Sequence, residues 1–282
     1  MNWTQNRKEI KLISRQMYKS TAHVSVWASF VIFLVLMALP AIIRNIFTPV
    51  VDVTDLLEAY TSAADPEAIS AIYSELLLEL FTGRNIALMI AIFLVCTLIQ
   101  GPITMGAAGF FNGVSRGQQL KITSVFSWFK NSRMALKAFW LTLLIYIIEA
   151  AFFFVLYMLP FVLLMVMGML SFPPVIMIPI FVFSILVCLF FLLVLITRLG
   201  LAVYIMAILD CKVGKAIGGA FKITRGRTAF ETFLFTLSFI GYILLCIITF
   251  GAGMIFLMPY FMTAHCIYTR RLLYRAGMII CE

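Results

Sequence analysis

The sequence predicts an all-α membrane protein with six transmembrane helices, arranged as three hairpins that each follow a basic amphipathic interfacial helix. Two observations carry this prediction. The 282-residue chain is 63% hydrophobic and only 12% charged, whereas an average soluble domain is about half apolar and about a quarter charged. Apolar runs also recur along the whole chain, and several exceed the roughly 18 residues that indicate a bilayer span. Lipid is therefore the expected solvent for most of the surface.

We expect one polytopic domain, residues 1–282, in which apolar spans alternate with polar segments. The six spans are residues 24–43, 86–113, 138–170, 175–209, 230–250 and 253–269. The polar segments are an inner interfacial helix at 1–23, an acidic extracytoplasmic segment at 44–85, and basic cytoplasmic segments at 114–137 and 210–229. The first span has the length of a crossing and no clear cleavage pattern follows it, so we interpret it as a retained helix.

The third and fourth spans are longer than the roughly 20 residues of a straight crossing. Pro160, Pro173, Pro174 and Pro179 lie in the outer half of this hairpin, where proline removes backbone donors and bends helices. Two long tilted helices are the plainer interpretation. A broken or partly re-entrant outer segment is the alternative.

The positions of the basic residues orient the chain. Of the 21 lysines and arginines, all but Arg44, Arg84 and Arg198 lie before the first span, in the two basic segments or after the sixth span. By the positive-inside rule, this one-sided distribution predicts that the N and C termini are both cytoplasmic. Because topology accounts for the net charge of +9, we expect no nucleic-acid partner.

Three stretches, one before each hairpin, carry basic residues at helical spacing beside an apolar stripe. In the second and third stretches the basic residues are Lys121, Lys130, Arg133, Lys212, Lys215 and Lys222. The apolar stripe of the second is Ile122, Val125, Phe126 and Phe129. Such helices lie in the inner interface and attract anionic lipid headgroups. The lipid bilayer is thus the expected partner, and a membrane-protein partner or a homo-oligomer is a further one.

Glu149 and Arg198 are the two charges that fall deep inside predicted spans. Each lies about 16 Å along its helix from the inner end, at 1.5 Å per residue, and therefore near the midplane of the bilayer. An ionisable residue at that depth is a functional candidate. We expect Glu149 and Arg198 to form a buried pair, which either holds the hairpin together as a structural salt bridge or lines a polar pathway.

Two polar residues of the last span are further candidates. His265, near the inner end, is either a proton relay or pH sensor, or an interfacial hydrogen-bonding group, which is the more frequent role. Tyr260 follows Pro259 at an expected kink and should find a hydrogen-bond partner inside the bundle. Both predictions concern residues that would be costly to bury without a partner.

Other sequence features point to packing and away from catalysis. Gly109, Gly113 and Gly117 have the GxxxG spacing of a helix-packing surface. The six cysteines show no CxxC spacing and the two histidines have no nearby ligands, so we predict no cofactor and no metal. Motifs such as HExxH, GxSxG and the Walker lysine loop are absent, so we do not expect an enzyme.

Leu237 to Tyr268, which reads LSFIGYILLCIITFGAGMIFLMPYFMTAHCIY, resembles the C-terminal signature of the bacterial family called domain of unknown function 975. Tyr242 replaces the family's tryptophan, and Ile267-Tyr268 replaces its phenylalanine-tyrosine. The stretch GPITMGAAGFF, Gly101 to Phe111, is similar to the family's second helix. The resemblance implies six spans in a bacterial cytoplasmic (plasma) membrane, and it implies no reaction.

Two hypotheses for function follow. The leading one is a non-enzymatic protein that moves or senses a small solute or lipid around the Glu149/Arg198 pair. The alternative is a structural or accessory membrane protein that binds another membrane component without a translocation path. The two hypotheses differ in whether a polar cavity reaches the charges. A membrane enzyme acting on lipid ranks third, because no reactive group supports it.

Overall fold

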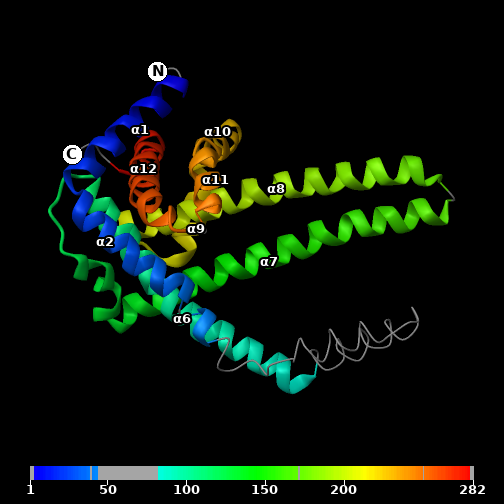
Figure 1. Ribbon diagram of the computed structural model, residues 1–282, viewed down its shortest axis with the longest axis horizontal. Coiled ribbons are helices and arrows are strands. Elements are labelled where there is room, and N and C mark those ends of the chain that lie inside the picture. Colours follow the sequence, from blue (N-terminus) through cyan, green and yellow to red (C-terminus); the bar gives the residue numbers. More distant parts are fainter. Residues whose placement is uncertain (1–2, 39, 44–81, 171, 250, 280–282) are drawn as a thin grey trace. The chain divides into compact units, whose positions relative to one another are not determined.

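The computed structural model of the protein describes residues 3–38, 40–43, 82–170, 172–249 and 251–279, and these form helices and no strand (Figure 1). In chain order they are α1 (Trp3–Ser20), α2 (Ala22–Phe33), the π-helix η1 (Leu34–Ala38), α6 (Gly83–Val114), the 3-10 helix η2 (Ile122–Lys130), α7 (Ser132–Met169), α8 (Pro174–Leu209), α9 (Val213–Ile223), α10 (Arg227–Leu237), α11 (Ile240–Ile248) and α12 (Met254–Arg275). The all-helical prediction is confirmed.

The chain divides into two compact units, residues 1–32 with 101–282 and residues 33–100. The helix α6 contributes to both. In the smaller unit, the side-chain amide of Gln100 donates a hydrogen bond to the carbonyl of Leu36 in η1 at 3.4 Å. Of the predicted acidic segment 44–85, residues 44–81 lie outside the described part of the chain.

Among the described residues, five stretches of helix are long and apolar enough to cross a membrane. They are Ala22–Ile43, Gly83–Val114, Ser132–Met169, Val175–Leu209 and Arg227–Ile248. The helix α12 is not among them, because its C-terminal half carries His265, Arg270 and Arg271. These five stretches are consistent with a multi-span membrane protein, and the sixth crossing stays a prediction.

The fifth stretch differs from the continuous helix predicted at 230–250. The helix α10 ends at Leu237 and α11 begins at Ile240, with Ser238 and Phe239 forming a turn between them. The local sequence is apolar on both sides of the turn and contains no proline. Hydropathy alone therefore did not indicate the interruption.

The third and fourth spans form a long antiparallel hairpin of α7 and α8, which pack side by side (Figure 1). Asn131 caps α7 by accepting a hydrogen bond from the backbone amide of Arg133 at 3.0 Å. Pro174 begins α8, a position where the missing amide costs no helical hydrogen bond. Both helices continue through their internal prolines, Pro160 and Pro179, as the plainer interpretation predicted.

The core of the larger unit is built from side chains of several helices. Among its largest fully buried side chains are Phe110 and Phe111 of α6, Leu141 of α7, and Phe235 of α10. The hairpin is different: in an 18-residue apolar stretch of α8, only 6% of the residues are buried. An apolar surface of that extent is expected where lipid replaces water.

The segment before the third span is helical, but its apolar stripe was predicted wrongly. Residues 122–130 form a 3-10 helix, in which side chains three residues apart lie on one face. Val125 and Trp128 are buried, whereas Phe126 and Phe129 are exposed. The predicted stripe assumed the α-helical period and therefore combined residues of both faces.

The segment before the fifth span, α9, forms the predicted amphipathic helix. Its apolar face covers protein, because Ala216, Gly219, Ala220 and Ile223 are buried and α9 packs on α8. The six predicted lipid-contact residues in this segment and the preceding one, Lys121, Lys130, Arg133, Lys212, Lys215 and Lys222, are all exposed. This exposure leaves the basic side chains accessible to a membrane surface.

Candidate functional site

Glu149 and Arg198 lie where the α7–α8 hairpin leaves the helical core. The buried side chains of α7 between Ala138 and Ile145 all precede Glu149. In α8 the buried run from Leu199 to Met206 follows Arg198. In the part of the hairpin between Glu149 and Arg198 along the chain, few of the described residues are buried. We call the level of Glu149 and Arg198 the hairpin base.

Arg198 is held by α9 and its C-terminal end. Its Nε donates to the hydroxyl of Thr224 at 2.9 Å, one terminal nitrogen donates to the carbonyl of Phe221 at 3.3 Å, and the guanidinium lies 4.6 Å from the centre of the Phe221 ring. The carbonyl of Phe221 is one of the last four of α9, which have no partner within a helix. Arg198 therefore caps the C-terminal end of α9, where a positive charge is favourable.

These contacts replace the expected Glu149–Arg198 pair. The ion pairs formed by the described residues are Lys137–Asp210, Arg227–Glu231 and Arg271–Glu9, so Glu149 takes part in none there. The physical reason is that orphan carbonyls and a hydroxyl lie within reach of the long arginine side chain. Glu149 is half-buried at the hairpin base.

His265 lies in an aromatic cluster built from three helices. It is 5% exposed, and its ring is 4.3 Å from Phe261, 5.2 Å from Phe235 and 5.7 Å from Tyr204, measured between centroids. Its buried Nε2 has no hydrogen-bond partner in the described part of the chain. The expected hydrogen bond is therefore not formed within the described residues, and the ring is enclosed by other aromatic rings.

Tyr260 joins the edge of the same cluster. Its ring lies 5.4 Å from Phe239 and 5.9 Å from Tyr242. Phe239 belongs to the turn between α10 and α11, and the ammonium of Lys11 lies 4.4 Å from the centre of its ring. Lys11 also donates to the carbonyl of Ser238 at 2.8 Å. A basic residue of α1 therefore stabilises the interruption in the fifth apolar stretch, a contact that sequence reasoning missed.

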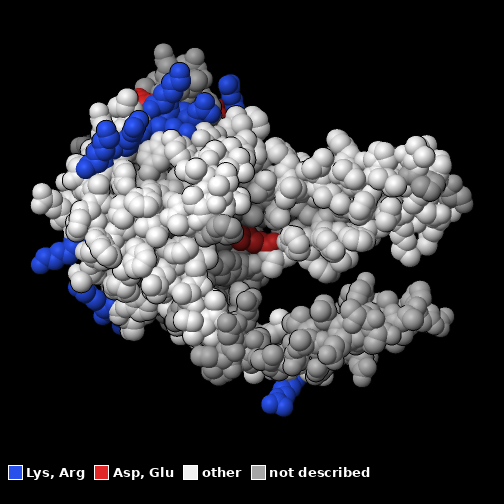
Figure 2. Space-filling model, viewed as in Figure 1, with Lys and Arg blue, Asp and Glu red and all other residues white. Residues whose placement is uncertain are grey.

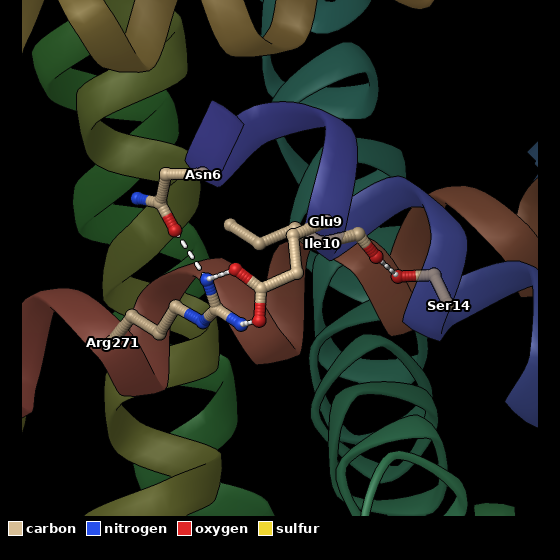
Figure 3. Close-up of polar contacts among 5 residues, drawn as sticks. All are labelled: Asn6, Glu9, Ile10, Ser14 and Arg271. Carbon is tan, nitrogen blue, oxygen red and sulfur yellow. Dashed lines mark hydrogen bonds and ion pairs between the residues drawn. The ribbon is translucent and has the colours of Figure 1, made fainter. Parts of the chain in front are cut away.

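The N-terminal helix is bound to α12 by a set of polar contacts, shown in Figure 3. The guanidinium of Arg271 donates to both carboxylate oxygens of Glu9, at 3.0 and 3.3 Å, and to the side-chain carbonyl of Asn6. Asn6, Ile10 and Ser14, four residues apart, are the buried stripe of α1. We call the contacts among Asn6, Glu9 and Arg271 the α1 clasp. The sequence predicted α1 only as a helix at the membrane interface, whereas the α1 clasp shows that α1 also packs against α12.

Acidification is expected to weaken the α1 clasp. The hydrogen bond from Arg271 lowers the pKa of Glu9. The stability that this pair contributes is therefore present above the unfolded-state pKa, about 4.3, and is lost as the pH falls through the lower folded-state pKa. Thermal unfolding in detergent from about pH 7 to pH 3 should show an acid-induced loss that is smaller in Glu9→Gln. Glu231→Gln, which removes the partner of Arg227, is the control, and an unchanged acid response in Glu9→Gln would contradict the prediction.

The three glycines predicted to pack helices have different roles. Gly113 lies against Leu120 and Gln118, and a β-carbon on Gly109 would only touch the Trp128 indole at 4.0 Å. The prediction for Gly117 is wrong, because α6 ends at Val114 and Gly117 has a φ of +75° in the following turn. Glycine is favoured there because it has no β-carbon to clash.

The closest backbone approaches occur at two glycines that the GxxxG pattern missed. A β-carbon on Gly101 would lie 2.9 Å from the carbonyl oxygen of Ala138, and one on Gly106 would overlap the carbonyl oxygen of Val125. Both residues stand in the GPITMGAAGFF stretch, but their spacing of five does not match the packing motif. The described residues contain no group of three histidine, cysteine or acidic side chains that could hold a metal ion.

The described residues contain five helical stretches apolar enough to cross a membrane and no group of side chains that could hold a metal ion. A family model described as Protein of unknown function (DUF975) matches residues 1–276. The chain belongs to this family. Membership confirms the resemblance seen in Leu237–Tyr268 and extends it over the hairpin and the α1 clasp. Comparison with curated proteins and with solved structures gave no match, so the function of this family member has to be argued from its own residues.

Proposed function

We propose that this protein is a non-enzymatic, multi-pass protein of a bacterial cytoplasmic membrane that moves or senses a small solute or lipid at the hairpin base. The separation of Glu149 from Arg198 carries the proposal. Arg198 is satisfied by Thr224 and Phe221, whereas Glu149 has no ion pair among the described residues. A carboxylate in an apolar hairpin is costly unless water, a proton or a ligand compensates its charge.

We further propose six crossings with both termini cytoplasmic. The α1 clasp supports an even number of crossings between Glu9 of α1 and Arg271 of α12, because these two residues must lie on the same side of the membrane to touch. Between these two residues the described part of the chain has five apolar stretches, so α12 would supply the sixth crossing. The exposed basic residues support a cytoplasmic assignment for this side. In Figure 2, basic atoms gather over the part of the larger unit that holds α1 and α10.

Reaction of a cysteine at residue 149 with a water-borne thiol reagent tests the proposal. In a background that lacks the six native cysteines, Glu149→Cys is expected to react, because a site that handles a solute must be reached by water. Ile147→Cys is the matched control, since Ile147 is a 52% exposed apolar residue of the same helix that would face lipid. The measurement is the rate of modification by a membrane-impermeant methanethiosulfonate, followed by mass spectrometry.

The alternative is a structural or accessory protein without a translocation path. It predicts that Glu149→Cys and Ile147→Cys are equally unreactive, because no polar cavity would then reach the hairpin base. That result would contradict the leading proposal. The exposed basic residues of η2 and α9 would in that case be the better candidates for binding another membrane component or anionic lipid.

A further inference from the structure

An apolar groove of about 400 Å³ lies between α7 and α8, beyond the hairpin base. Its most distinctive wall is aromatic: Phe153, Tyr157 and Phe161 of α7 meet Phe181 of α8. Adjacent ring centroids are 5.8 Å apart for Phe153 and Tyr157, 4.9 Å for Tyr157 and Phe161, and 5.7 Å for Phe161 and Phe181. Such a groove has the size of a site for a drug-sized ligand.

Glu149 continues the row of aromatic residues in α7 toward the hairpin base. Glu149, Phe153, Tyr157 and Phe161 follow one another at intervals of four residues, so each is a neighbour of the next on the surface of α7, in a row that winds slowly around the helix. The carboxylate therefore lies one helical turn from the groove's first aromatic ring. Figure 2 shows acidic atoms where the hairpin joins the rest of the larger unit, while the rest of the hairpin is uncharged on the face in view.

We propose that the groove and Glu149 bind a lipophilic organic cation. The inference rests on the proposed function, because both place the ligand at Glu149, and it adds the chemical class. Aromatic faces attract a cation held within about 6 Å, and the carboxylate supplies the counter-charge in a region where an unpaired cation would be costly. An anion of the same shape would meet only repulsion from Glu149.

The ligand is a free cation and not the ammonium group of a phospholipid. Acyl chains gain from any apolar wall, whereas a compact cation gains in addition from nearby aromatic rings and from the carboxylate of Glu149. The groove volume of about 400 Å³ also suits one compact molecule. The experiment below distinguishes a free cation from a phospholipid ammonium group.

Equilibrium binding of tetraphenylphosphonium to the purified protein in phosphatidylglycerol nanodiscs tests this inference. We expect saturable binding above that of empty nanodiscs, and no competition from tetraphenylborate, which has the same shape and the opposite charge. Glu149→Gln should weaken binding by about tenfold or more, since it removes the counter-charge. Tyr157→Leu should weaken it several-fold, whereas Phe154→Leu, at an exposed position outside the groove, should not.

The outcomes separate the ligand class from the proposed function. Absence of saturable binding, or equal binding of tetraphenylborate, would overturn the inference, while reactivity of a residue-149 cysteine would still support the proposed function. Loss of tetraphenylphosphonium binding in phosphatidylethanolamine nanodiscs would show that a lipid ammonium group fills the site and would overturn the choice of a free cation. If Glu149→Gln fails to fold, Tyr157→Leu and Phe154→Leu still test the inference: equal tetraphenylphosphonium binding by these two variants would show that the groove does not bind the cation.

Discussion

Replacing Gly106 with alanine is expected to lower the free energy of unfolding by about 1–3 kcal/mol, the usual cost of forcing extra volume into a packed site. The added β-carbon would overlap the backbone carbonyl oxygen of Val125 in η2. A backbone group cannot rotate away as the end of a flexible side chain can. The helices α6 and η2 would therefore have to move apart, which would also disturb the buried Val125 and Trp128.

Gly109→Ala is the matched control for this prediction. It lies in the same helix, and its β-carbon would make only an ordinary contact with Trp128. Because alanine favours a helix over glycine by about 1 kcal/mol, Gly109→Ala should leave stability unchanged or raise it. Thermal unfolding of both variants in the same detergent checks the difference. Equal melting temperatures for Gly106→Ala and Gly109→Ala would show that α6 and η2 do not approach as closely as the structure has them.

Removing the guanidinium at residue 198 is expected to destabilise the hairpin base by about 1.5–3 kcal/mol, the range for hydrogen bonds to charged groups. Arg198→Met keeps most of the apolar stem but removes the donors to Thr224 and Phe221. It also removes the positive charge at the C-terminal end of α9. Thr197→Val, which loses only a local hydrogen bond to the carbonyl of Val194, is the control and should change stability by less than about 0.5 kcal/mol.

Two double-mutant cycles identify the partner of Arg198. Arg198→Gln and Thr224→Val should be coupled, because each removes one side of the same hydrogen bond. Arg198→Gln and Glu149→Gln should show coupling near zero, because these residues form no ion pair in the structure. Strong coupling between Glu149 and Arg198 would instead restore the buried pair that the sequence suggested and would remove the main support for a free carboxylate at the hairpin base.

Hydropathy predicted the large-scale features because it depends on composition over many residues. The apolar runs placed the five described stretches that are apolar enough to cross a membrane, and the spans 138–170 and 175–209 match α7 and α8 closely. The sixth expected span, 253–269, lies within α12 except for its first residue, and the polar C-terminal half of α12 makes this helix less apolar than the five stretches that could cross a membrane. The interruption at Ser238 and Phe239 escaped prediction, because the residues around it are as apolar as those of an unbroken helix.

The candidate site was predicted in part. Sequence alone established that Glu149 and Arg198 are the charges embedded in the hairpin, since no other charged residue lies deep in α7 or α8. It also indicated that Lys212, Lys215 and Lys222 accompany an amphipathic helix. These inferences needed only residue order and the helical period. For η2 even the period was unknown beforehand, and the wrong side chains were assigned to one face.

The tertiary structure decided which groups meet. Arg198 reaches Thr224 and Phe221, Lys11 reaches Ser238, and Arg271 reaches Glu9, across separations along the chain of 26, 227 and 262 residues for Thr224, Ser238 and Glu9. A long cationic side chain has several acceptors of similar strength within its reach, such as carboxylates, hydroxyls and the free carbonyls at helix ends. Which acceptor it contacts depends on where helices end and how they pack, and neither property is a local feature of the sequence.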